Sequence, residues 1–247
     1  VDYSGAAKVF YILVSMEILT VMFLIPSFTA GSIAGEREKQ TLDILLTTTL
    51  TPGEIIMGKL MSSISMVFLL VVSSLPIISI VFTIGGIGME DMLMFMLEIL
   101  IISFFIGSMG MLASTMLKKT VQATVCSFAQ IVLVCGGTVV VVIVAYIAAK
   151  LYYYNCMGAV GSMPDVSSVL FILLINPAFT IVQMTAKHCE SISVISKAAG
   201  MLNGSMPSTI VDNWFRLSMI SQMIVTVILL RISAILLKPT RKKKTVS

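Results

Sequence analysis

The sequence contains few charged residues for its length. Only 11% of its 247 residues are Asp, Glu, Lys or Arg, whereas 57% are hydrophobic, and the mean hydropathy is +1.05. A chain with so few polar side chains cannot cover the surface of a water-soluble globular domain. The composition therefore excludes a soluble fold and indicates an integral membrane protein.

Histidine and cysteine are also scarce. The single histidine, His188, and the four cysteines do not have the spacing of a metal site, and no pairing of nucleophile and base suggests an intramembrane enzyme. Cys126 and Cys135 lie in an apolar run, where thiols act as small apolar groups. Cys156 and Cys189 lie in a more polar region, so a disulfide between them is an open alternative. We expect no metal and no cofactor bound by this chain.

Long apolar runs dominate the remaining sequence. A helix needs about 20 residues to cross a bilayer, and helices satisfy their own backbone hydrogen bonds. Five runs are long enough, and they show no alternating pattern of barrel strands. We therefore predict an all-α polytopic bundle in a single membrane domain, residues 1–247. The predicted spans are Val9 to Ile33, Ile55 to Ile84, Met92 to Leu117, Val121 to Ala149 and Leu217 to Leu237.

A sixth apolar stretch, Val169 to Met184, is too short for a typical span. Asn176-Pro177 interrupts it near the middle, and proline removes a helical hydrogen-bond donor. We predict a re-entrant or interfacial hairpin within an extracytoplasmic region, residues 150–216.

Basic residues predict the orientation, because Lys and Arg near span ends are retained on the cytoplasmic side. If residues 35–59 lie inside, ten basic residues lie inside and five outside. The inner residues include Lys118-Lys119 and a basic tail, residues 238–247, so the C-terminus is predicted to be cytoplasmic. With five spans, Val1 must then lie outside, although no signal sequence precedes it. We therefore expect the full protein to contain a sixth, N-terminal span.

The most informative polar segment is Gly35 to Lys59. Leu42, Leu45, Leu46 and Leu50 recur at helical spacing, which predicts a short amphipathic helix along the membrane. This helix and the turn after it are predicted to occupy residues 35–54. Thr51 and Glu54 then have the spacing of a capping box at the start of the next span. Physical grounds alone favour the alternative, an ordinary interfacial loop that anchors two spans.

The end of this segment imitates a phosphate-binding loop. Gly53, Gly58 and Lys59 have the right spacing, but Leu60 replaces the Ser or Thr that would bind magnesium, and no strand precedes them. We therefore expect a separate subunit to bind ATP.

Two carboxylates lie inside predicted spans, where burial of a charge is costly. They are Glu17 and Glu98, each about two turns from the outer end of its span. One interpretation places them at an outer vestibule or pairs them with a base such as Arg216. The other gives them a role in the passage of substrate or cations.

The order of motifs in the polar segment resembles permease subunits of type-2 ABC exporters. The pattern consists of GERE at residues 35–38, TLDILL at 41–46, TP at 51–52 and GK at 58–59. Pro26 in the preceding span, the basic inner turn, the broken outer stretch and the basic tail also fit, so the resemblance covers nearly the whole chain. The resemblance implies six spans, which agrees with the sixth, N-terminal span expected from the predicted orientation.

The resemblance implies a cytoplasmic coupling helix that docks on a separate ABC ATPase subunit, which carries ATP and Mg. The contact residues would be Glu36, Arg37, Glu38, Thr41, Leu42, Leu45 and Leu46. It further implies a second permease chain, a location in the cell membrane, export of an unidentified substrate, and no nucleic-acid partner. An alternative is a non-transporting sensor or immunity component that docks a soluble protein through the same segment.

Overall fold

The computed structural model describes residues 4–47, 49–84, 88–157, 164–190, 193–204 and 206–237. These residues are mainly helical and contain no strand, which confirms the predicted all-α class. The elements in chain order are α1 (Ser4–Glu38), α2 (Leu42–Leu46), α3 (Pro52–Ile84), α4 (Met89–Met116), α5 (Thr120–Val132), η1 (Leu133–Gly137), α6 (Thr138–Tyr152), η2 (Tyr153–Met157), η3 (Ser167–Ile175), α7 (Pro177–Glu190), α8 (Val194–Met201), α9 (Ser208–Asp212) and α10 (Trp214–Leu237).

Five helical segments in the described part of the chain are long and apolar enough to cross a membrane, as predicted. The fourth is longer than expected because α5, η1 and α6 form one continuous helical arm. The candidate spans are Ile12–Glu38, Pro52–Pro76, Met92–Met116, Thr120–Asn155 and Trp214–Leu237.

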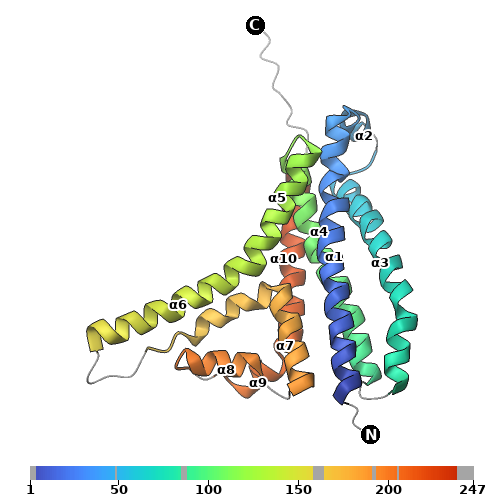
Figure 1. Ribbon diagram of the computed structural model, residues 1–247. Helices are drawn as coiled ribbons and strands as arrows, with labels where there is room; N and C mark the ends of the chain where they lie inside the picture. Colours follow the sequence, from blue (N-terminus) through green and yellow to red (C-terminus); the bar gives the residue numbers. More distant parts are fainter. Residues whose placement is uncertain are drawn as a thin grey trace.

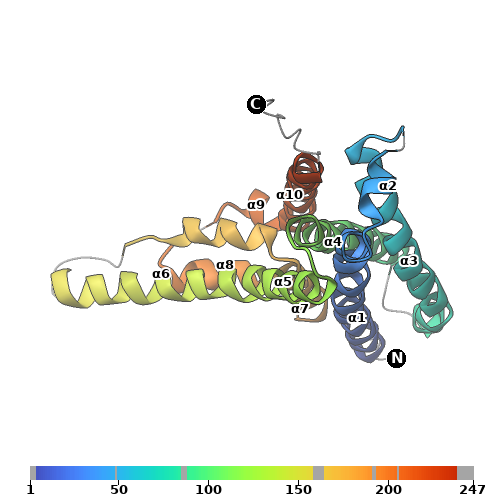
Figure 2. The same ribbon diagram turned by 90° about the horizontal axis from the view of Figure 1, so that it is seen from above.

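Helix α4 is the centre of the bundle and packs against α1, α3, α5 and α10 (Figures 1 and 2). Its buried side chains, such as Ile102 and Phe105, form a continuous core with those of α1 and α3. The arm α5–η1–α6 begins beside α1 and α4 but then leans away from them (Figure 1). As a result, 56% of the central span is buried within the protein but only 11% of the arm span.

Glycines permit the close approach of α1 and α4. A Cβ atom at Gly110 would overlap the hydroxyl of Thr29 on α1 and lie 2.9 Å from its Cβ atom. A Cβ atom at Gly107 would lie 2.6 Å from Leu60 Cδ1 on α3. The end of the Leu60 side chain can move aside, so the stricter requirement for glycine is at Gly110, where α1 and α4 pack closely as helices do in a membrane.

The predicted break at Asn176-Pro177 is confirmed, since η3 ends at Ile175 and α7 begins at Pro177. The Asn176 side chain donates hydrogen bonds to the Cys135 carbonyl (2.9 Å) and the Thr138 hydroxyl (2.8 Å). Cys135 belongs to η1, a π-helical turn, so Asn176 fastens the break to the place where the arm changes its helical winding. Whether this segment enters the membrane stays a prediction.

Two predictions fall outside the described residues or side chains. The alternative of a disulfide concerns the side chains of Cys156 and Cys189, which are not described, and the basic tail begins after Leu237. Cys126 and Cys135 are free thiols within the arm.

Candidate functional site at the corner between α1 and α3

The polar segment is divided among three helices. We expected one short helix and a turn over residues 35–54, but α1 continues to Glu38, Gln40 takes a left-handed conformation (φ 59°), and α2 spans only Leu42–Leu46. The corner lies at one end of the bundle, with α2 beyond the start of α3 (Figure 1). The reason for the difference is tertiary, because contacts with three other helices hold the last turn of α1.

The predicted capping box at the start of α3 is confirmed. The Thr51 backbone N–H donates to Glu54 Oε2 (2.7 Å), and the Glu54 N–H donates to Thr51 Oγ1 (3.3 Å). The two side chains thereby satisfy each other's backbone donors at the helix end. This fixes the point at which the chain enters α3.

Glu36 joins α1 to α3. Lys59 Nζ donates to Glu36 Oε1 at 2.5 Å, and the side chains of Lys59 and Glu36 are only 25% and 27% exposed. Partial burial reduces the solvent screening that makes exposed ion pairs weak. Lys59, the end of the phosphate-loop lookalike, is therefore used in an ion pair within the bundle.

Arg37 joins α1 to the end of α4. Its Nη1 donates to the carbonyl oxygens of Thr115 (3.1 Å) and Leu117 (3.0 Å). The last carbonyls of a helix have no partner within the helix and carry the negative end of its dipole. The Arg37 guanidinium donates hydrogen bonds to these carbonyls, and its positive charge complements the negative end of the dipole.

Glu38 joins α1 to the start of α5. Its Oε2 accepts hydrogen bonds from the Thr120 backbone N–H (3.1 Å) and from Thr120 Oγ1 (2.7 Å). A carboxylate is favoured at a helix N-terminus, where the first N–H groups lack partners and the dipole is positive. We call Glu36, Arg37 and Glu38 the clamp, since three consecutive residues of α1 hold α3, α4 and α5.

Helix α2 has two different sides. Leu42 is 8% exposed and packs into a core with Ile33, Ile56 and Leu60, while Leu45 is half-buried against it. Two of the four leucines of the predicted stripe, Leu42 and Leu45, thus face the bundle, whereas Leu50 is exposed. Ile44 is 70% exposed and was missed by the sequence reasoning.

Most of the residues predicted to contact the ATPase subunit are therefore not on the exposed side of the corner. Thr41, Ile44, Thr47 and Leu50 are exposed. Glu38 is exposed as well, but all three residues of the clamp have partners within the chain. The side chain of Leu46 lies outside the described part. The sequence does contain a signal for Ile44, because it lies outside the leucine stripe. An apolar side chain on that side of a surface helix is left exposed by its own protein.

The two carboxylates within spans differ in their surroundings. Glu17 Oε1 accepts a hydrogen bond from Ser74 Oγ on α3 (2.7 Å). Glu98 is 1% exposed, and neither of its oxygens has a partner among the described residues. Arg216 is exposed and makes no ion pair with either carboxylate in this part of the chain, which contradicts the suggested pairing.

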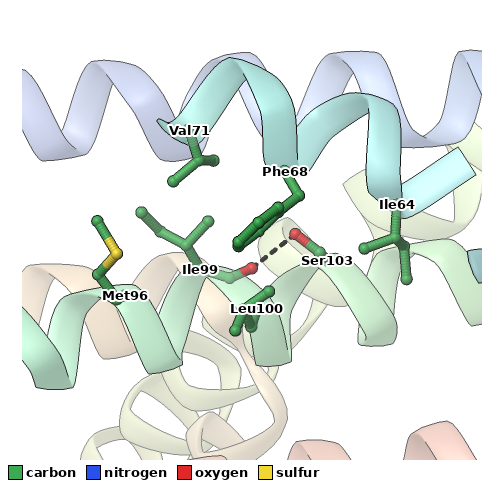
Figure 3. A pocket seen from close by; sticks show the side chains of 7 residues that line it. All are labelled: Ile64, Phe68, Val71, Met96, Ile99, Leu100 and Ser103. Carbon is green, nitrogen blue, oxygen red and sulfur yellow. Dashed lines mark hydrogen bonds between the residues drawn. The ribbon is translucent and has the colours of Figure 1, made fainter. Parts of the chain in front are cut away.

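The bundle contains a small cavity between α3 and α4 (Figure 3). Its volume is about 20 Å³, and the one hydroxyl at its wall, that of Ser103, donates to the Ile99 carbonyl. A space of this size holds a single water at most. It is therefore not a substrate site. The side chains around it are Ile64, Phe68, Val71, Met96, Ile99, Leu100 and Ser103.

Comparison with known families covers nearly the whole chain. The model of the ABC-2 family transporter protein matches residues 4–238, a range that includes the corner and all five candidate spans. No match to a curated protein was found. The helical spans and this family match agree that the chain is a multi-pass membrane protein, and it belongs to the ABC-2 family of transporter permeases.

Proposed function

We propose that this permease couples ATP hydrolysis by a separate ABC ATPase subunit to the export of a substrate. The observation that carries the proposal is the two-sided geometry of α2. Leu42 fixes the helix to the bundle, while Ile44 projects from the opposite side with 70% of its surface exposed. A surface helix with an isolated apolar side chain among threonines suits the groove of a soluble partner.

The proposed route of coupling runs through the clamp. A partner that moves α2 also moves the last turn of α1, to which a short turn connects it. Glu36, Arg37 and Glu38 then pass the movement to α3, α4 and α5, because each makes a direct contact with one of those helices. Packed helices respond to such a displacement as rigid bodies. ATP and Mg act in the partner subunit and move the membrane helices only through this contact.

This proposal changes the roles of the residues first assigned to docking. Thr41, Ile44, Thr47 and Leu50 would touch the ATPase, and Glu36, Arg37 and Glu38 would transmit its movement. The proposal also places the corner and the C-terminus in the cytoplasm, in agreement with the excess of basic residues at that end.

We further propose that a second permease chain completes the transport path. The arm leaves the bundle, and only 11% of its span is buried within this chain. A homologous or identical partner could cover part of the arm, with the bilayer covering the rest.

Glu98 is proposed to take part in the passage of substrate or cations. A buried carboxyl group without a hydrogen-bond partner destabilises the folded protein. A residue with this cost is usually retained because it has a function. Glu17 is the weaker candidate for this role, because its carboxylate already accepts a hydrogen bond from Ser74.

Affinity purification of the full-length chain in detergent tests the coupling proposal. We expect an ATPase with a complete phosphate-binding loop to co-purify with the wild type and with Ile44→Val, but not with Ile44→Asp. Co-purification of a soluble protein that does not hydrolyse ATP, lost in Ile44→Asp, would instead support the sensor or immunity alternative. Equal recovery of the ATPase with all three chains would contradict docking on α2.

A further inference from the structure

A groove separates the start of α3 from the end of α10. It has a volume of about 320 Å³, at the lower end of the range of about 300 to 1,000 Å³ for small-molecule pockets. It lies at the same end of the bundle as the corner, since α3 begins there and α10 ends there (Figure 1). Its lining includes Gly53, Met57, Val227, Leu230, Arg231 and Ala234.

Exposed apolar side chains line the groove, so it would face lipid if α3 and α10 cross a bilayer. Met57 is 43% exposed and Val227 is 53% exposed, one on each helix. At the end of the groove, a Cβ atom at Gly53 would meet no atom within 4 Å. The missing side chain of Gly53 therefore leaves space that a neighbouring helix does not fill.

Among the described residues that line this groove, only Arg231 carries a charge. Its side chain is exposed, and no described residue offers it a carboxylate or a hydrogen bond. It lies six residues before Leu237, or about 9 Å from the end of α10 at the rise of an α-helix. At that depth a guanidinium extends along the protein to the headgroup layer, with its stem on apolar surface.

We propose that this groove binds an anionic phospholipid, with an acyl chain along the apolar wall and the phosphate at Arg231. Apolar contact gives little preference for a particular lipid, because the bilayer is as apolar as the groove. Selectivity arises from the guanidinium, which donates paired hydrogen bonds to phosphate oxygens. The net negative charge of the lipid matters because the guanidinium has no carboxylate partner in the described structure.

The site is independent of the ATPase coupling proposed above and requires only that the bundle spans a bilayer. It connects α10 to the first turn of α3, which follows α2 in the chain. A bound lipid would therefore hold together two helices that otherwise leave a gap at the corner.

A local fluorescence measurement tests this proposal in the full chain reconstituted in bilayers. The chain contains one tryptophan, Trp214, at the opposite end of α10, so Met57→Trp in a Trp214→Phe background places a single reporter in the groove. Quenching by brominated phosphatidylglycerol is compared with quenching by brominated phosphatidylcholine at equal mole fraction. We expect a preference for phosphatidylglycerol of about fivefold, the factor for one basic residue near an anionic headgroup.

The variants distinguish the groove from a general attraction of anionic lipids. Arg231→Gln should abolish the preference, Arg231→Lys should keep part of it, and Arg216→Gln at the far end of α10 should leave it unchanged. Gly53→Leu should reduce quenching by both lipids, because it fills the groove. If Trp214→Phe impairs folding, the reporter is measured with Trp214 retained and its constant signal subtracted. Equal preference in the wild type and Arg231→Gln would overturn the proposal.

Discussion

Glu38 on α1 caps the first residue of α5, Thr120, with both hydrogen bonds on a single carboxylate oxygen, Oε2. The two residues are 82 positions apart in the sequence. The preceding residue, Arg37, binds the last carbonyls of α4. Adjacent side chains of opposite charge thus complement the opposite dipoles of two helix ends that meet at one turn.

Loss of the Glu38 cap should destabilise the turn between α4 and α5. We expect Glu38→Ala to lower the melting temperature of the purified protein, and to lower it less in a Thr120→Val background, where one of its two hydrogen bonds is already absent. The measurement is a double-mutant cycle of melting temperatures. Lys39→Ala is the matched control, because Lys39 is the next residue and its side chain is exposed. Additive effects of the two substitutions would show that the hydrogen bond from the Thr120 hydroxyl does not contribute to stability.

The two sides of α2 should respond differently to substitution. Leu42→Ala should lower stability by about 2 kcal/mol, since it leaves a cavity in the core, whereas Ile44→Ala should change stability by less than about 0.5 kcal/mol. Binding of the co-purified ATPase should weaken about tenfold or more in Ile44→Ala if Ile44 is an anchor of the interface. Thermal melting and a binding titration separate the two effects. Loss of stability in Ile44→Ala would place this side chain in the core.

Charge reversal of the clamp should interrupt coupling without preventing insertion. Glu36→Lys combined with Glu38→Lys places repulsion opposite Lys59 and removes the cap of α5. We expect the ATPase to remain bound and to continue hydrolysing ATP while export in cells falls. The control is Lys59→Glu with Glu36→Lys, which exchanges the two charges and should restore part of the export. Unchanged export in the double reversal would argue against transmission through the clamp.

Gly110 should be the least replaceable glycine of the described helices. Gly110→Ala places a Cβ atom against Thr29 and should destabilise the protein by about 1 to 3 kcal/mol, the usual cost of overpacking. Gly136→Ala is the control, since a Cβ atom there would meet nothing within 4 Å. Denaturation in detergent measures both variants. Equal stability of the two would mean that α1 and α4 do not pack this closely.

Glu98 offers a test that separates stability from transport. Glu98→Met replaces two buried oxygens that lack partners with an apolar side chain of similar length, so we expect the free energy of unfolding to rise by about 1 to 3 kcal/mol. If the carboxyl group serves transport, export should fall in the same variant and in Glu98→Gln. Unchanged export and pH dependence in Glu98→Gln would contradict the functional role.

Sequence patterns were sufficient where the cause is local. The lengths of the apolar runs predicted all five candidate spans, and the spacing of Thr51 and Glu54 predicted a capping box that the structure contains. The break at Asn176-Pro177 followed from the missing N–H of proline. Each of these features depends on a few neighbouring residues or on the thickness of the bilayer, and both are readable from the chain alone.

Local sequence patterns did not predict the orientation of the charged side chains at the corner. The family resemblance implied that Glu36, Arg37, Glu38 and the leucines of the stripe contact a partner subunit. Instead, the charges bind residues 23 to 82 positions away, and Leu42 packs into the bundle. Pattern shows that one side of a helix is apolar, but it does not show whether that side meets its own protein or another.

The sequence by itself determined that this is a helical membrane protein with a polar corner, because hydropathy and capping act over short distances. Only the tertiary structure decided that the clamp binds other helices of the same chain and that Ile44 is left exposed. The physical reason is that unpaired helix ends of α4 and α5 need a cation and an anion, and packing brings the last turn of α1 to them.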